Sequence, residues 1–238
     1  MTSSTERVLM VLDSMGTGGT ETYVLSLGIP MRSRGAVLFY AGADGPLRPA
    51  FAEAGFHIHL LKASAREPLA ERRRKAESFY REIMERERIT VVHVHQTPSG
   101  LLAASAAKEL GIPVVFTMHG TYYPKEEAIR LAQLCDSVIT VSKPVQRFWE
   151  RSGINSTVIS NGVDVHAFHP EAWQKEANAI AKLPAIPAGA PVVTYVSRLA
   201  WQKASVCNML LRATKELSDL PDLHVIVVGT GAQSHHVQ

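Results

Sequence analysis

Short runs of β-branched and aliphatic residues alternate with helical patterns along most of the chain, and this alternation constrains the fold more than any other feature. Seven such runs precede residue 160, at 8–12, 36–40, 57–61, 91–95, 114–118, 137–141 and 157–159. Strands that alternate with helices pair in parallel, and the helices pack on both faces of the sheet. The sequence therefore predicts an α/β protein with a doubly wound parallel sheet.

A proline-rich stretch, 183–191, interrupts the alternation with three prolines and one glycine in nine residues, which is typical of a linker. We therefore assign residues 1–182 to a first domain. Beyond the linker, runs at 192–196 and 224–228 flank a helical pattern at 206–217. One βαβ unit of roughly 50 residues is too small to bury a core of its own. The segment 192–238 is thus expected to be the incomplete start of a second doubly wound domain.

The composition excludes several classes of protein. The 238 residues include 46% hydrophobic and 20% charged residues, which indicates a globular rather than a disordered chain. No apolar run of about 18 residues is present, and the polar first residues do not resemble a signal peptide. The two cysteines, Cys135 and Cys207, are far apart, which argues against a disulfide framework and a cysteine metal site. We expect a cytoplasmic protein.

Positive charge is concentrated between residues 62 and 88, which hold nine Lys and Arg against six Asp and Glu. The centre of this segment, 72–75, lies in a helical pattern that places Leu69 and Phe79 on the opposite, apolar face. A solvated helix face is one interpretation. The other is that helix 66–88 contacts an anionic membrane or a phosphorylated acceptor. Nucleic acid is not expected as a partner, because few aromatic residues interleave the basic run.

A glycine-rich loop, 16–19, follows the first run and precedes a helical pattern. Glycines let a backbone approach a ligand closely, and the free N–H groups of a helix amino terminus attract anions. The loop is not the dinucleotide fingerprint, because Glu21 occupies the third glycine position, nor is it a P-loop. Phosphate binding and a simple tight turn both remain open for it.

Three histidines are expected near the carboxyl ends of adjacent strands. His93 and His95 are two residues apart, so their side chains share one face, and His119 ends the next strand. Histidines lining a crevice are one interpretation, and a zinc-dependent hydrolase is another. No acidic ligand is close in the sequence, so we predict no metal and assign a ligand-facing role to His119.

Two cations flank the end of the strand predicted at 192–196. Arg198 follows this strand and Lys203 enters the next helix. Cations at this place would bind a diphosphate, although a pair of surface charges is the simpler alternative.

Taken in order, these motifs resemble the retaining glycosyltransferase family 4, which has the GT-B architecture of two Rossmann-like domains. The matching segments are 18–21, 92–95, 113–120, 136–143, 159–164, 195–203 and 227–231. The resemblance implies an enzyme that transfers a sugar from a nucleoside diphosphate sugar to a glycan, lipid or small-molecule acceptor. It also implies retention of the anomeric configuration and no need for a cofactor.

The resemblance further implies roles for individual residues in a crevice between the two domains. The donor-binding residues would be Gly18, Gly19, Arg198 and Lys203. His119 would be the catalytic residue that contacts the donor sugar. The acceptor side of the crevice would hold His95, Asn161 and Gly162.

Several features depart from the family pattern. Ser197 and Ala204 stand where the family often has glycine, and Pro30 close behind Gly28 predicts a short, broken first helix. The Glu-x7-Glu segment of the family, which contacts the donor sugar and ribose, is expected beyond Gln238. A second hypothesis is therefore a non-catalytic binding or scaffold subunit derived from such an enzyme.

Overall fold

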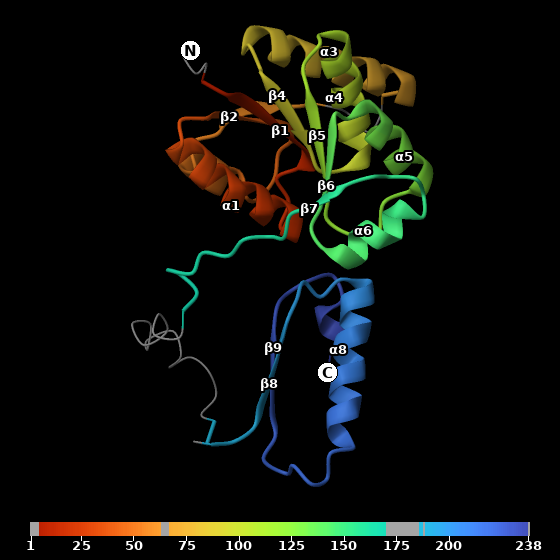
Figure 1. Cartoon of the computed structure of the whole chain (residues 1–238). Helices are drawn as coiled ribbons and strands as arrows, with labels where there is room; N and C mark the ends of the chain where they lie inside the picture. The colour runs from red at the N-terminus through yellow and green to blue at the C-terminus, as the bar shows by residue number, and fades with distance from the viewer. Residues whose placement is uncertain (1–4, 63–66, 170–185, 188, 238) are drawn as a thin grey trace. The chain divides into compact units, whose positions relative to one another are not determined.

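The structure is a computed structural model that describes residues 5–62, 67–169, 186–187 and 189–237. The chain divides into two compact units, residues 1–168 and 169–238, and each is described by itself (Figure 1). Part of the expected linker at 183–191, namely residues 183–185 and 188, lies outside the described residues, and the domain boundaries derived from it remain predictions.

The first unit is built on an all-parallel sheet with the strand order β3-β2-β1-β4-β5-β6-β7. Its strands are β1 (Arg7–Ser14), β2 (Val37–Ala43), β3 (His57–Leu60), β4 (Val91–Val94), β5 (Val114–Met118), β6 (Ser137–Thr140) and β7 (Thr157–Val158). The order reverses between β1 and β4, as in a doubly wound sheet, which confirms the predicted fold class. Ligands of such sheets bind at the carboxyl edge beside this reversal.

Helices cover both faces of this sheet (Figure 1). One face carries α1 (Gly19–Ser33) and α2 (Arg48–Glu53), and the other carries α3 (Leu69–Arg86), α4 (Thr97–Glu109), α5 (Lys125–Leu134) and α6 (Lys143–Glu150). Side chains alternate along β1, so that Met10 packs toward the first pair of helices and Leu9 and Val11 pack toward the others. The βαβ connections on either side of the reversal are right-handed, so they place the two sets of helices on opposite faces of the sheet.

Helix α1 is continuous, so the expected short and broken first helix was wrong. It runs for 15 residues with Pro30 inside it. Gly28 is buried in α1, where a Cβ atom would lie 2.6 Å from the ring of Phe56. The glycine therefore permits close packing of α1 and does not end the helix.

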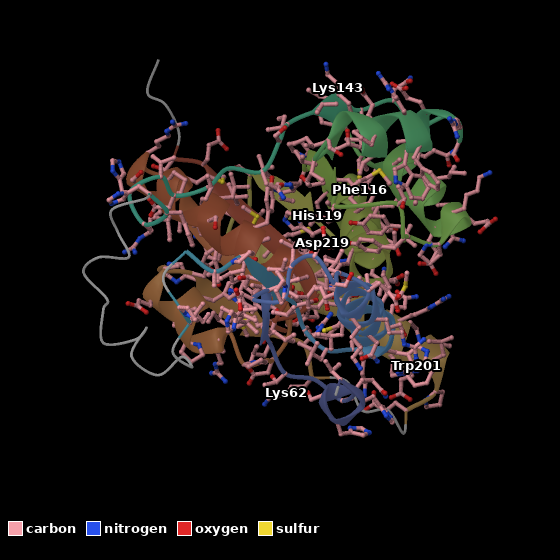
Figure 2. The ribbon with its side chains drawn as sticks, turned by 90° about the horizontal axis from the view of Figure 1, so that it is seen from below. Lys62, Phe116, His119, Lys143, Trp201 and Asp219 are labelled. Carbon is pink, nitrogen blue, oxygen red and sulfur yellow. The ribbon has the colours of Figure 1, made fainter. Side chains whose placement is uncertain are left out.

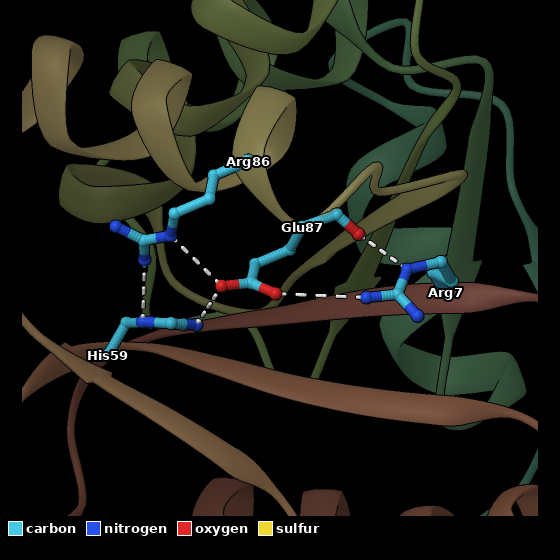
Figure 3. A network of polar contacts seen from close by, with 4 residues as sticks. All are labelled: Arg7, His59, Arg86 and Glu87. Atoms are coloured by element: carbon cyan, nitrogen blue, oxygen red, sulfur yellow. Dashed lines mark hydrogen bonds and ion pairs between the residues drawn. The ribbon is translucent and has the colours of Figure 1, made fainter.

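A network of polar contacts joins the end of α3 to β1 and β3 (Figure 3). The carboxylate of Glu87 lies 3.7 Å from Nη2 of Arg7 and 3.5 Å from Nε2 of His59. Arg86 lies within 3.2 Å of Nδ1 of His59. The carboxyl end of α3 is thereby fixed to the sheet.

None of the described helices is long and apolar enough to cross a membrane.

The second unit contains one parallel βαβ arrangement, as expected for the start of a second Rossmann-like domain (Figure 1). Its elements are β8 (Val192–Val196), α8 (Trp201–Lys215), β9 (His224–Val228) and the short 3-10 helix η2 (Ser234–His236). Helix α8 begins at Trp201, earlier than the helix predicted at 206–217. Ala204 and Cys207 form its buried face, which places a small residue where the family often has glycine.

Candidate active site

His95 and His119 come together at the carboxyl edge of the first sheet. They follow the neighbouring strands β4 and β5, and Nδ1 of His95 lies 3.2 Å from Nε2 of His119. Figure 2 labels His119 near Phe116 of β5. His95 has no exposed surface, whereas His119 is partly exposed. The structure thus places His95 behind His119, as its hydrogen-bond partner.

Tyr23 of α1 packs its ring against both histidines in edge-on contacts. The ring centroids are 4.8 Å apart for His119 and 5.8 Å apart for His95. Burial raises the pKa of Tyr23, and a hydrogen bond from Thr117 partly offsets this rise. Tyr23 was not predicted as a site residue, although its position one helical turn after Gly19 could have indicated it.

The three histidines of this edge share a dry environment that keeps them neutral. Burial lowers the pKa of His93 to about 3 and that of His119 to about 4. Burial, together with the two neighbouring imidazoles, holds the pKa of His95 well below its usual value. His93 also shares a hydrogen bond of 2.8 Å with the Thr117 hydroxyl. Neutral imidazoles can hydrogen-bond a polar substrate without introducing charge.

The metal-site interpretation of these histidines finds no support in their geometry. A hydrogen bond joins Nδ1 of His95 to Nε2 of His119, and Nε2 of His93 shares a hydrogen bond with the Thr117 hydroxyl. Within the described part of the chain, no group of His, Cys, Asp and Glu side chains is arranged to hold a metal ion. His119 is the hydrogen-bond partner of His95 and Thr117 is that of His93, while the buried Nε2 of His95 has no partner among the described residues.

The backbone around His119 is held from both sides by aromatic side chains. The Tyr123 hydroxyl accepts a 3.0 Å hydrogen bond from the His119 N–H and donates one of 3.0 Å to the His95 carbonyl. The Trp149 indole N–H donates to the Gly120 carbonyl at 2.9 Å. Tyr123 therefore links the ends of β4 and β5 and fixes the position of the His119 side chain.

Replacing Tyr123 by phenylalanine is expected to lower the free energy of unfolding by about 1–3 kcal/mol, because two buried backbone groups lose their partner. Hydrogen exchange of the His119 amide should accelerate. Tyr80→Phe is the matched control, since Tyr80 is also buried and its hydroxyl makes no hydrogen bond within the described residues. Urea unfolding and amide exchange would measure both variants. Equal effects in the two variants would contradict this role of Tyr123.

The predicted glycine loop lies at the amino end of α1. Gly18 is the N-cap residue in an extended conformation, and Gly19 is the first helical residue. A Cβ atom on Gly18 would come within 2.6 Å of the Glu21 carboxylate, which is itself buried in the first turn. An acidic residue at this place is stabilised by the helix dipole. A side chain at position 18 would therefore have to displace the Glu21 carboxylate, whereas Gly19 has open space around it.

Asn161 and Gly162 lie in the exposed segment after β7. The next ordered feature there is Asp164, whose carboxylate accepts hydrogen bonds from the N–H groups of His166 and Ala167 at 2.9 and 3.1 Å. These bonds lower the pKa of Asp164. The predicted acceptor role of Asn161 and Gly162 remains a prediction.

Arg198 and Lys203 belong to the second unit. Arg198 lies in the loop between β8 and α8, and Lys203 lies in the first turn of α8, where its carbonyl accepts a 2.7 Å hydrogen bond from the Tyr195 hydroxyl. The turn after β9 crosses this loop closely, because a Cβ atom on Gly229 would lie 1.8 Å from the Ser197 carbonyl oxygen. This close crossing positions the loop that carries Arg198.

One family model and several known proteins match this chain. The model of the family described as Glycosyltransferase Family 4 matches residues 17–167. A phosphatidylinositol N-acetylglucosaminyltransferase component of Arabidopsis thaliana is 28% identical over 166 residues, which cover 63% of this chain and 34% of that protein. D-inositol 3-phosphate glycosyltransferase of a Nocardioides species is 26% identical, over 89% of this chain and 53% of that protein.

Solved structures with the same fold include a GT-B-like neighbour with bound ligands. The crystal structure of Anabaena HepE in complex with UDP and glucose has a TM-score of 0.73 and 18% sequence identity, and covers 96% of this chain and 62% of that one. This chain therefore spans less than two thirds of the length of each of these proteins. Since the family model covers more than half of its residues, the chain belongs to Glycosyltransferase Family 4.

Proposed function

We propose that the protein transfers a sugar from a nucleoside diphosphate sugar to a hydroxyl group of an acceptor. The observation that carries this proposal is the family match over residues 17–167, which includes Gly18, Gly19 and His119. The position of His119 at the carboxyl edge of the sheet adds support, because ligands of doubly wound sheets bind there.

Uridine diphosphate is the proposed nucleotide of the donor. Similarity to HepE, whose crystal structure contains UDP and glucose, supports this choice. Arg198 and Lys203 would bind the two phosphates and stabilise the negative charge that grows as the diphosphate departs. The amino end of α1, with Gly18 and Gly19, would offer N–H groups to an anionic group of the donor.

In the proposed reaction the bond between the anomeric carbon and the diphosphate oxygen breaks, and a bond from that carbon to the acceptor oxygen forms. The acceptor proton passes to the departing phosphate oxygen, so no protein base is required. Attack on the face from which the diphosphate leaves would retain the anomeric configuration. His119, neutral because of its lowered pKa, would hydrogen-bond a hydroxyl of the donor sugar, and His95 would hold its ring.

The proposed acceptor is an inositol phosphate or a related phosphorylated polyol. Both curated relatives support it by name, one acting on phosphatidylinositol and the other on D-inositol 3-phosphate. A cytoplasmic location with peripheral contact to an anionic membrane is part of the proposal. Its support is the run Arg72, Arg73 and Arg74 on α3, beside Lys75, which is paired with Glu67 and Glu71.

The test is the release of nucleoside diphosphate from UDP-glucose, UDP-N-acetylglucosamine and GDP-mannose with D-inositol 3-phosphate as acceptor. His119→Ala and Arg198→Ala are each expected to lower kcat/KM about 100-fold or more. Arg212→Ala, which removes an exposed cation of the same unit, should leave it within about twofold. A chain that binds the donor but forms no product with any acceptor would contradict transfer and favour the non-catalytic binding or scaffold role.

A further inference from the structure

A groove of about 700 Å³ lies over α4 in the outer helical layer of the first unit. Helices α3 and α5 form its walls, as the order of these helices in Figure 1 shows. The charged side chains that line it are Asp13, Arg72, Arg73, Glu77, Glu127 and Arg130, and the polar side chains include Ser99. We call it the α4 groove. Arg72 and Arg73 also belong to the basic run proposed above for membrane contact, and none of the donor-binding or catalytic residues lines the groove.

The sequence of α4 explains why a groove forms here. The helix contains one glycine, two serines and four alanines between Thr97 and Glu109, so it lies close to the sheet. A Cβ atom on Gly100 would already be 2.9 Å from the side chain of Leu131 on α5. The bulkier side chains of α3 and α5 therefore project beyond the surface of α4, and α4 forms the base of the groove.

The charged groups of the α4 groove are not paired with each other. Three arginines line it, and within the described residues no ion pair involves Arg72, Arg73 or Arg130. Two of the three carboxylates that line the groove, those of Asp13 and Glu127, are held by hydrogen bonds instead. Asp13 accepts a 3.2 Å hydrogen bond from the Ser99 N–H, and Glu127 accepts one of 2.8 Å from the Thr97 hydroxyl.

Two buried polar atoms of the α4 groove have no hydrogen-bond partner among the described residues. They are Nε of Arg72 and Oγ of Ser99, and the Ser99 side chain is only 8% exposed. A buried polar atom without a partner is unfavourable, so such atoms mark places where a polar ligand fits. The two atoms come from different helices that face the same groove.

Apolar surface borders these polar groups. Leu69 was expected on the buried face of α3 but is 58% exposed, and it lines the α4 groove together with the half-buried Leu101 and Leu102. Exposed leucines beside unpaired arginines suit a ligand with a phosphate group and an apolar part.

We propose that the α4 groove binds the acceptor, a phosphorylated polyol, and this inference rests on the proposed function. The phosphate lies among Arg72, Arg73 and Arg130, whose guanidinium groups match its oxygens. The polyol hydroxyls donate to the carboxylates of Asp13 and Glu127 and bond to the free Ser99 hydroxyl. The same chemistry occurs in a soluble inositol phosphate and in the headgroup of phosphatidylinositol.

Calorimetric binding of D-inositol 3-phosphate to the full chain, without any donor, tests this proposal. Arg72→Gln, Arg130→Gln and Ser99→Ala are each expected to weaken binding about tenfold. Arg147→Gln is the matched control, since Arg147 is an exposed cation of α6 that does not line the groove and has no role in the proposed function. Circular dichroism would confirm that the variants fold. Unchanged affinity in the three groove variants, or no binding by the wild type, would overturn the proposal.

Further measurements distinguish the ligand source and separate this inference from the proposed function. If the headgroup is the ligand, vesicles containing phosphatidylinositol should bind the wild-type chain more tightly than the groove variants. Vesicles containing phosphatidylserine should bind the wild type and the variants equally. Inorganic phosphate binding as tightly as the inositol phosphate would overturn recognition of the polyol. Sugar transfer with an unchanged acceptor KM in the groove variants would reject the groove and leave the proposed function standing. Groove-dependent binding of D-inositol 3-phosphate without sugar transfer would support the groove and reject the proposed function.

Discussion

Acidification below about pH 6.5 is expected to destabilise the first unit steeply, because its three buried site histidines resist protonation in the folded state. Their pKa values are lowered by burial, to about 3 for His93 and about 4 for His119, and well below the usual value for His95. The unfolded chain therefore binds more protons between about pH 6.5 and 4, so stability falls as the pH falls. Each histidine contributes up to about 1.4 kcal/mol per pH unit, and the three together up to about 4.

Urea unfolding followed by tryptophan fluorescence, to which the buried Trp149 contributes, at a series of pH values from about 7.5 to 5, would measure this slope. His93→Gln should reduce it by about 1.4 kcal/mol per pH unit. Val94→Ala is the control, since it removes buried apolar surface on the other face of β4 and should lower stability equally at every pH. A wild-type free energy of unfolding that stays constant over this range would refute the prediction.

Replacing Gly42 by alanine is expected to lower the free energy of unfolding by about 3 kcal/mol or more. A Cβ atom there would lie 2.1 Å from the carbonyl oxygen of Leu12 and 2.6 Å from the hydroxyl of Tyr40. The pairing of β1 with β2 shifts register between Val11 and Ser14, which brings the Leu12 carbonyl against Gly42. The backbone cannot move away without disrupting the central strand pair. The thermal midpoint should fall by about 6 °C or more.

The matched control is Gly19→Ala, because a Cβ atom on Gly19 would meet no other atom within 4 Å. Its effect on stability should stay within about 1 kcal/mol, since alanine also favours the helix that begins there. Thermal unfolding by circular dichroism would compare the two variants. Equal midpoints for Gly42→Ala and the wild type would show that the strands adjust to the added methyl group.

The order of strands and helices could be predicted from the sequence because each element has its own local pattern. The strand expected at 114–118 was found with those bounds, and the helix expected at 206–217 was found, although α8 begins at Trp201. Prediction failed where packing decided the outcome. Gly28 and Pro30 suggested a break in α1, but the contact with Phe56 uses the glycine inside a continuous helix. Leu69 matched the apolar face of α3, yet it lies at the exposed end of that helix.

The candidate site shows the same division between local and distant information. His95 and His119 were expected at neighbouring strand ends, and their 3.2 Å contact confirms that they meet, although their roles in catalysis remain proposals. Tyr23, Tyr123 and Trp149 were missed, because they come from three different helices or loops. Tyr123 is four residues after His119, but Tyr23 and Trp149 are distant from it in the sequence. The packing of their helices against the sheet brings them together.

The sequence by itself determined the class of fold, the family and the strand ends where polar side chains gather, because periodicity and ordered motifs are local properties of the chain. Only the tertiary structure decided which groups lose water and which remain without partners. Burial lowers the pKa values of His93 and His119, and helix packing leaves the Ser99 hydroxyl unpaired in the α4 groove. Burial and pairing depend on contacts between distant segments, and no sequence pattern records those contacts.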